Sequence, residues 1–135
     1  MKLDKLTNVT NTTTTPRALT TEEINDIIVD SIQDIKGQNI IKLDLRKLYD
    51  APTDYFIICE GTSNVQISAI AGNIEKRLRQ EAGLRPSHLE GANGGRWVLA
   101  DYFYTVVHIF HPEAREFYDL ESLWSDALST QYQNI

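Results

Sequence analysis

Cysteine is nearly absent from this chain of 135 residues, because Cys59 is the only one. No disulfide can form within one chain, and no site with several cysteine ligands can hold a metal ion. Long apolar runs are missing too, since none approaches the roughly 20 residues that cross a bilayer. The basic start is not followed by the uninterrupted apolar core of a secretory signal. We therefore expect a cytoplasmic protein without a membrane segment.

Basic residues are outnumbered, with 13 Lys and Arg against 19 Asp and Glu, which gives a formal net charge of −6. A polyanionic phosphate backbone repels such a surface unless its basic residues cluster. We therefore expect little direct nucleic-acid contact and favour a basic protein partner. Hydrophobic residues make up 41% and charged residues 24% of the chain, the balance of an ordinary globular domain.

The N-terminal part changes character at Thr20. Residues 1–19 are rich in Thr and Asn and poor in apolar side chains, so we expect a flexible tail. Thr20 and Glu23 have the spacing of a capping box, which predicts a helix start. Gly37 is expected to cap the end of this helix. Its apolar stripe comprises Ile24, Ile27, Ile28, Ile32 and Ile35.

Two strands and a second helix are expected next. Alternation of apolar and charged residues over 41–46 predicts a half-exposed strand, and the apolar run 55–59 predicts a central strand covered on both faces. Ser63 and Gln66 can form a second capping box, and Gly83 ends the helix that follows. The expected inner stripe of this helix comprises Val65, Ala69, Ile70, Ile74 and Leu78.

The rest of the chain predicts a hairpin and a last helix. Residues 96–100 and 105–110 have strand composition around a short turn, and Pro112 is suited to the first turn of a helix. The last helix is expected to pack inward through Phe117, Leu120, Leu123 and Trp124. We expect one α/β (α+β) domain over 20–126, a mixed β-sheet flanked by helices, followed by a fraying C-terminus over 127–135.

Catalytic and metal-binding patterns are weak. The three histidines are His88, His108 and His111, and the last two should point to opposite faces of a strand, so we expect no metal site. The turn 61–63, Gly-Thr-Ser, resembles a phosphate-binding turn before a helix. No Asp-x-Asp or Glu-x-Asp pair follows it to hold metals for phosphoryl transfer. We therefore expect no catalytic residues and no cofactor, with Ser63 as a helix cap.

Aromatic residues gather where polar ones are expected. Tyr102, Phe103 and Tyr104 occupy the predicted hairpin turn, and Trp97 lies on the adjoining strand. Exposed aromatic side chains at a rigid turn are suited to binding a partner. The alternative, that Trp97 and Phe103 complete the core, has equal weight.

Four further segments stand out in this order along the chain. The first is the run Asp54-Tyr55-Phe56-Ile57-Ile58-Cys59-Glu60-Gly61-Thr62-Ser63. The others are Leu89-Glu90-Gly91, then the run 96–102, and then Val106-Val107-His108-Ile109-Phe110 leading to the run 115–124. Together, these segments resemble the ribosomal silencing factor (Iojap) family. The resemblance begins near Thr20 and ends at Trp124.

The resemblance implies a nucleotidyltransferase-like fold that lacks the catalytic carboxylates. It also implies binding to the large ribosomal subunit through ribosomal protein L-fourteen, which blocks association with the small subunit and represses translation. The partner-facing residues carried over are Trp97, Val98, Asp101, Tyr102 and Glu90. Phe103 and Tyr104 depart from the family pattern, in which a small or acidic residue is common. Self-association as a homodimer is compatible with the family. The alternatives are a divergent nucleotidyltransferase-like nucleotide-binding protein and a large-subunit assembly adaptor.

Overall fold

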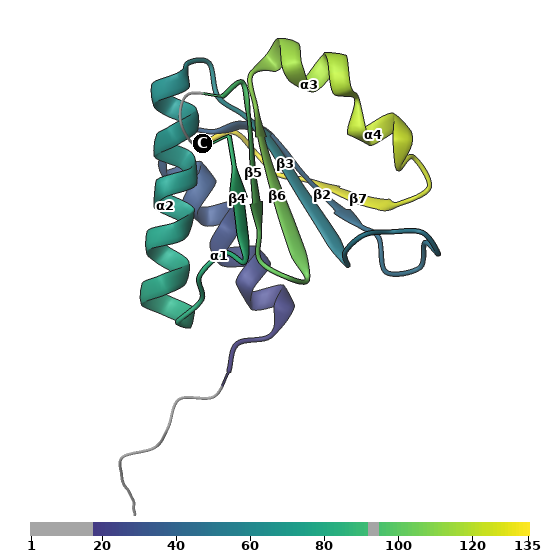
Figure 1. Cartoon of the computed structure of the whole chain (residues 1–135), viewed down its shortest axis with the longest axis horizontal. Coiled ribbons are helices and arrows are strands. Elements are labelled where there is room, and N and C mark those ends of the chain that lie inside the picture. The colour runs from purple at the N-terminus through teal and green to yellow at the C-terminus, as the bar shows by residue number, and fades with distance from the viewer. Residues whose placement is uncertain (1–17, 92–94) are drawn as a thin grey trace, which may run out of the picture.

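The computed structural model describes residues 18–91 and 95–135. A six-stranded sheet in the order β4-β5-β6-β3-β2-β7 forms the centre of the described fold. Helices α1 and α2 cover one face of this sheet, and α3 and α4 lie against the other (Figure 1). In chain order the elements are α1 (Thr21–Asp34), β2 (Gln38–Asp44), β3 (Tyr55–Glu60), α2 (Asn64–Ala82), β4 (His88–Glu90), β5 (Trp97–Asp101), β6 (Thr105–Phe110), α3 (Pro112–Tyr118), α4 (Leu120–Leu123) and β7 (Leu128–Gln131).

The sheet is mixed, which confirms the α+β class. The two central strands β3 and β6 pair in parallel, and every other pair among the described strands is antiparallel. Each of the residues 55–59 in β3 is buried, as the continuous apolar run predicts for a central strand. Ile41 and Leu43 in β2 are buried, while Lys42 and Asp44 remain partly exposed. The alternating pattern therefore correctly predicted a strand with one buried and one partly exposed face.

Helix α1 begins with the expected capping box. The Thr20 hydroxyl accepts a hydrogen bond from the Glu23 amide, and the Glu23 carboxylate accepts one from the Thr20 amide. The expected role of Gly37 at the other end is wrong, because Lys36 takes the left-handed conformation with φ of 63°. The Gly37 amide donates to the Ile32 carbonyl, and a Cβ at Gly37 would lie 2.3 Å from the Ile32 side chain. Gly37 is therefore needed for close packing.

Helix α2 is longer and turns a different stripe inward from the one expected. Ile67, Ile70, Ile74 and Leu78 are its buried residues. Val65 is 80% exposed and Ala69 is also exposed, so both were placed wrongly. The buried stripe begins two residues later, at Ile67. Gly83 ends the helix in the left-handed conformation, as expected.

The C-terminal region differs most from expectation. Pro112 opens α3 as predicted, but Phe117 and Leu123 are 80% and 71% exposed, and only Leu120 and Trp124 pack on the sheet. The expected fraying over 127–135 is wrong for residues 128–131. These residues form the edge strand β7, which pairs antiparallel with β2 through backbone groups that need no apolar side chains. Of the expected tail over 1–19, residues 1–17 lie outside the described residues, as do residues 92–94.

Candidate partner-binding surface

The alternation of strand β5 divides the expected partner-facing residues between two faces of the sheet. Successive side chains in a strand point to opposite faces. Val98 is fully buried and packs into the core beneath α1 and α2, and Tyr102, just after the strand, joins the same core at 4% exposed. Val98 therefore offers no side-chain surface to a partner, and Tyr102 offers very little. The expectation of a surface that includes Val98 and Tyr102 is therefore corrected.

The other three expected residues share one face. Trp97 and Asp101 are partly exposed on β5, with Leu99 between them on the same side of the strand. Glu90 on β4 is opposite Leu99 in the antiparallel register, so the two side chains lie on the same face. A strip of aromatic, apolar and acidic groups therefore runs along β5 and β4. We call Glu90, Trp97, Leu99 and Asp101 the β5 strip.

The Trp97 indole is held by neighbours on β6 and α3. Its Nε1–H donates a hydrogen bond of 3.1 Å to Nδ1 of His108. The Trp97 ring centroid lies 5.0 Å from that of Phe110 and 4.5 Å from that of Tyr118. A cleft beside the indole is lined by Arg96, Trp97, Glu113, Ala114, Phe117 and Tyr118. The half-buried indole thus packs on one side and borders an open cleft on the other, so the sequence alternatives of core and interface both apply to Trp97.

Asp101 also has a structural task at the hairpin turn. Its carboxylate accepts a hydrogen bond of 2.8 Å from the Phe103 amide, and the Thr53 hydroxyl donates one of 2.9 Å to the Phe103 carbonyl. Phe103 has φ of 72°, a conformation that is strained for a residue with a large side chain. Phe103 and Tyr104 are each 63% exposed, so the idea that Phe103 completes the core is wrong. The turn presents two aromatic rings in a fixed backbone geometry.

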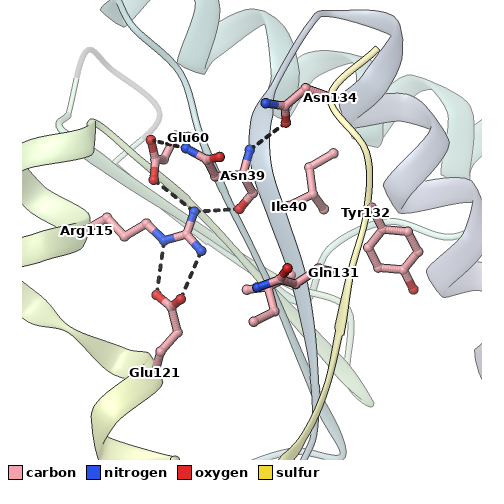
Figure 2. Close-up of a pocket in the computed structure, with 9 residues that line it drawn as sticks. Asn39, Ile40, Glu60, Arg115, Glu121, Gln131, Tyr132 and Asn134 are labelled. Atoms are coloured by element: carbon pink, nitrogen blue, oxygen red, sulfur yellow. Dashed lines mark hydrogen bonds and ion pairs between the residues drawn. The ribbon is translucent and has the colours of Figure 1, made fainter.

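Helix α3 is attached to the sheet by an ion cluster centred on Arg115 (Figure 2). The guanidinium donates to both carboxylate oxygens of Glu121, at 3.0 and 3.1 Å, and to Glu60 at 3.0 Å. It also donates to the Asn39 carbonyl at 2.6 Å, and the Asn39 side-chain amide donates to Glu60. These bonds connect α3 and α4 with the ends of β2 and β3. We read the pocket around them as a structural crosslink, because its charged groups already have partners.

Sequence reasoning missed the contribution of Arg115, Phe117 and Tyr118 to this region. The short helix was assumed to bury Phe117, whereas it buries Ala114 and turns Phe117 and Tyr118 toward the Trp97 cleft. The clue was available in the run Arg115-Glu116-Phe117-Tyr118, where two adjacent aromatic residues on a short helix cannot both face the sheet.

The Gly61-Thr62-Ser63 turn, Cys59 and the possible metal ligands were the candidates for chemistry in the described part of the chain. The Thr62 amide donates to the Gln66 side chain, and the Ser63 hydroxyl accepts from the Gln66 amide. The second capping box is therefore displaced by one residue, because Gln66 reaches Thr62 instead of Ser63. Burial raises the pKa of the Cys59 thiol to about 12. Within 18–91 and 95–135, no group of three or more His, Cys, Asp or Glu is arranged to hold a metal ion, and no helix there is long and apolar enough to cross a membrane.

The chain is similar to known proteins in both sequence and structure. A family model described as ribosomal silencing factor during starvation matches residues 18–135. The ribosomal silencing factor RsfS of Halalkalibacterium halodurans is 34% identical over 117 residues, covering 87% of this chain and 98% of that protein. The RsfS protein of Chromobacterium violaceum is 40% identical over 106 residues, covering 76% of this chain and 83% of its own. A crystal structure of a protein from Chromobacterium violaceum superimposes with a TM-score of 0.74 at 37% identity, covering 79% of this chain and 88% of that one.

The described residues form a small α+β domain around a mixed six-stranded sheet. Similarity to known proteins assigns this domain to one family. The family model covers all the described residues, and the relatives are matched over most of their own length. The chain belongs to the ribosomal silencing factor (Iojap) family, whose members are non-catalytic, ribosome-binding regulators of translation. Membership implies binding to the large ribosomal subunit.

Proposed function

We propose that this protein represses translation by docking the β5 strip onto ribosomal protein L-fourteen of the large subunit, where it blocks the small subunit. One observation carries this proposal. Trp97, Leu99 and Asp101 share a face of β5 with Glu90 of β4, and Trp97 at one end of this strip borders the open cleft beside α3. A half-buried tryptophan bordered by acidic groups has the composition of an interface anchor.

Charge supports a basic protein partner. The chain carries a net charge of −6, the exposed Glu90 belongs to the β5 strip, and the exposed Glu113 beside the cleft is paired with Arg96. Complementary charge raises the association rate and fixes orientation more than it adds affinity. Binding should therefore weaken as salt rises, because screening shortens the range of exposed charges.

The finer description of the fold belongs to the same proposal. We infer a nucleotidyltransferase-like framework that serves as a binding scaffold. The Gly61-Thr62-Ser63 turn lies between strand β3 and helix α2, where such enzymes hold phosphates. The donors and acceptors of this turn are engaged within the protein, since the Gly61 amide donates to Phe110 and the Thr62 amide to Gln66. These contacts favour helix capping over nucleotide binding.

Charge reversal on the strip tests the proposed function. Purified large and small subunits are sedimented through sucrose gradients with increasing amounts of the protein, and joined ribosomes and bound protein are scored. We expect Glu90→Arg to weaken large-subunit binding by about 10-fold and to restore subunit joining, because an exposed acid facing a basic partner becomes a repulsive charge.

Asp26→Arg is the matched control, because it makes the same change in net charge on the exposed side of α1. It should bind and block subunit joining like the wild type. If both variants bind like the wild type, the contact lies away from the β5 strip. If both weaken binding equally, net charge alone explains the affinity and the proposed docking geometry is wrong.

A further inference from the structure

His108 occupies an unusual position for an ionisable residue. It lies in the central strand β6 and is 3% exposed. The imidazole centroid is 4.5 Å from the ring of Phe56, in an edge-to-face arrangement, and 5.8 Å from that of Trp97. An aliphatic residue would fill this aromatic setting without the cost of burying polar nitrogens. The hydrogen bond from Trp97 distinguishes histidine from such a residue.

This hydrogen bond determines where the histidine proton lies. An indole N–H can only donate, so Nδ1 of His108 must be an unprotonated acceptor and the neutral ring carries its proton on Nε2. The surroundings agree, because burial lowers the pKa of His108 to about 4 and keeps the ring neutral near pH 7. Within the described residues Nε2 is buried and has no hydrogen-bond partner. A buried donor without a partner is destabilising, which suggests that His108 is present for its acceptor.

The Trp97–His108 bond can decide which edge of the indole faces the cleft. Packing on Phe110 and Tyr118 restricts the plane of the ring, but a turn of about 180° about its second side-chain torsion would keep that plane. Only one of the two orientations brings Nε1 to Nδ1 of His108. A hydrogen bond to a buried acceptor can therefore select a single orientation of the half-buried indole before any partner arrives.

We propose that His108 is a positioning residue for partner binding, which acts by holding the Trp97 indole in the orientation that the partner contacts. This inference rests on the proposed function of the β5 strip. His108 itself is buried and does not touch the partner. Its contribution is preorganisation, because an anchor that is already oriented loses less side-chain freedom on binding.

Three variants test the inference. His108→Leu removes the acceptor, and His108→Asn can place an amide oxygen close to the position of Nδ1. Trp97→Ala removes the anchor. Each variant is examined by circular dichroism for its fold and by a large-subunit binding titration. The indole N–H of Trp97 is followed by nuclear magnetic resonance, and a parallel Trp124→Phe protein assigns the two tryptophan signals.

We expect His108→Leu to weaken binding by up to about 10-fold, the range set by one lost hydrogen bond. Its Trp97 indole signal should shift and exchange faster with solvent. His108→Asn should restore slow exchange and most of the affinity. Recovery in the Asn variant would separate positioning from general packing, because both substitutions remove the imidazole ring.

Two outcomes would overturn the inference while leaving the proposed function intact. One is wild-type binding by His108→Leu when Trp97→Ala binds weakly. The other is an equal loss of affinity in the Leu and Asn variants, which would show that ring packing matters and the acceptor does not. If Trp97→Ala binds like the wild type, Trp97 is not an anchor and the inference fails, whereas the effect of Glu90→Arg still decides the docking of the rest of the strip.

Discussion

The two faces of the sheet are built differently. On one face lie helices of 14 and 19 residues, α1 and α2, over an aliphatic core. This core includes Ile28, Ile32, Ile67, Ile70, Ile74 and Leu78. On the other face, α3 and α4 have 7 and 4 residues. The side chains there include aromatic rings, the buried His108 and the Arg115 ion cluster. One face is thickly covered and the other is only partly covered.

This difference indicates how the protein separates stability from binding. Aliphatic packing gives the α1–α2 face most of its stability, with Asn25 and Ser31 as the buried polar residues of α1. The opposite face keeps Phe117 and Leu123 exposed and depends on specific polar contacts to hold α3 and Trp97. A surface that must meet a partner cannot bury all its apolar groups. Substitutions on the first face should therefore change folding, and those on the second should change binding more than folding.

The largest effect is expected from Ile74→Ala, in the middle of α2. Ile74 is fully buried in the aliphatic core, so its truncation leaves a cavity and should lower the free energy of unfolding by about 2–5 kcal/mol. Val65→Ala is the control on the same helix, because Val65 is 80% exposed, and should cost less than about 0.5 kcal/mol. Urea unfolding followed by circular dichroism measures both. Equal midpoints for the two variants would contradict the assignment of this face.

Acid should lower the free energy of unfolding through His108 on the other face of the sheet, because burial lowers the pKa of this residue from 6.5 to about 4. The unfolded chain binds a proton on this ring as the pH falls through 6.5, but the folded protein resists until about pH 4. The contribution to stability is therefore complete above pH 6.5 and is lost as the pH falls toward 4. Between pH 7 and pH 5 the loss should be about 2 kcal/mol, at about 1.4 kcal/mol for each pH unit below 6.5.

Carboxylates also titrate in this range, so His108→Leu provides the reference. Urea unfolding of both proteins at several pH values gives the difference in slope that belongs to His108. The wild type should lose stability faster than the variant between pH 6.5 and 5. Parallel curves would show that His108 is not held neutral by burial.

Local patterns in the sequence predicted the elements that are marked by cap residues or by a continuous apolar run. The box at Thr20, the apolar run of β3 and the cap at Gly83 all appear as expected. Strand β7 was missed, because Leu128-Ser129-Thr130-Gln131 has no marked apolar pattern and is exposed along its length. Its position depends on backbone pairing with β2, some 85 residues earlier, which single-sequence patterns do not report.

The residues expected to face the partner show a different limit of prediction from sequence. Trp97 and Asp101 have odd numbers on β5 and Val98 an even number, so strand alternation alone implies that Val98 faces away from the other two. That conflict could have been found from the sequence. The role of His108 could not, because its bond to Trp97 depends on the antiparallel register, in which His108 pairs with Leu99 and Trp97 with Phe110.

The smallest effects concern the helix caps, which also differ between the two faces. Helix α1 has the Thr20 capping box, whereas His111, the N-cap of α3, makes no side-chain hydrogen bond to the helix. Thr20→Ala should cost about 1 kcal/mol, and His111→Ser should gain about 0.5 kcal/mol, because a serine hydroxyl can accept from the free amides of Glu113 or Ala114. Thermal unfolding of the two variants measures both changes.

If Thr20→Ala lowers the free energy of unfolding and His111→Ser raises it, the N-cap of α1 is already optimal and that of α3 is not. The binding titration sharpens the result, because a better cap on α3 should leave large-subunit affinity unchanged if Arg115 already fixes the helix through Glu60 and Glu121. A loss of affinity in His111→Ser would mean instead that α3 must shift when the partner docks. The partial covering of that face by α3 would then have a role in binding, because a helix that is easily displaced can move Phe117 and Tyr118 into contact with the partner.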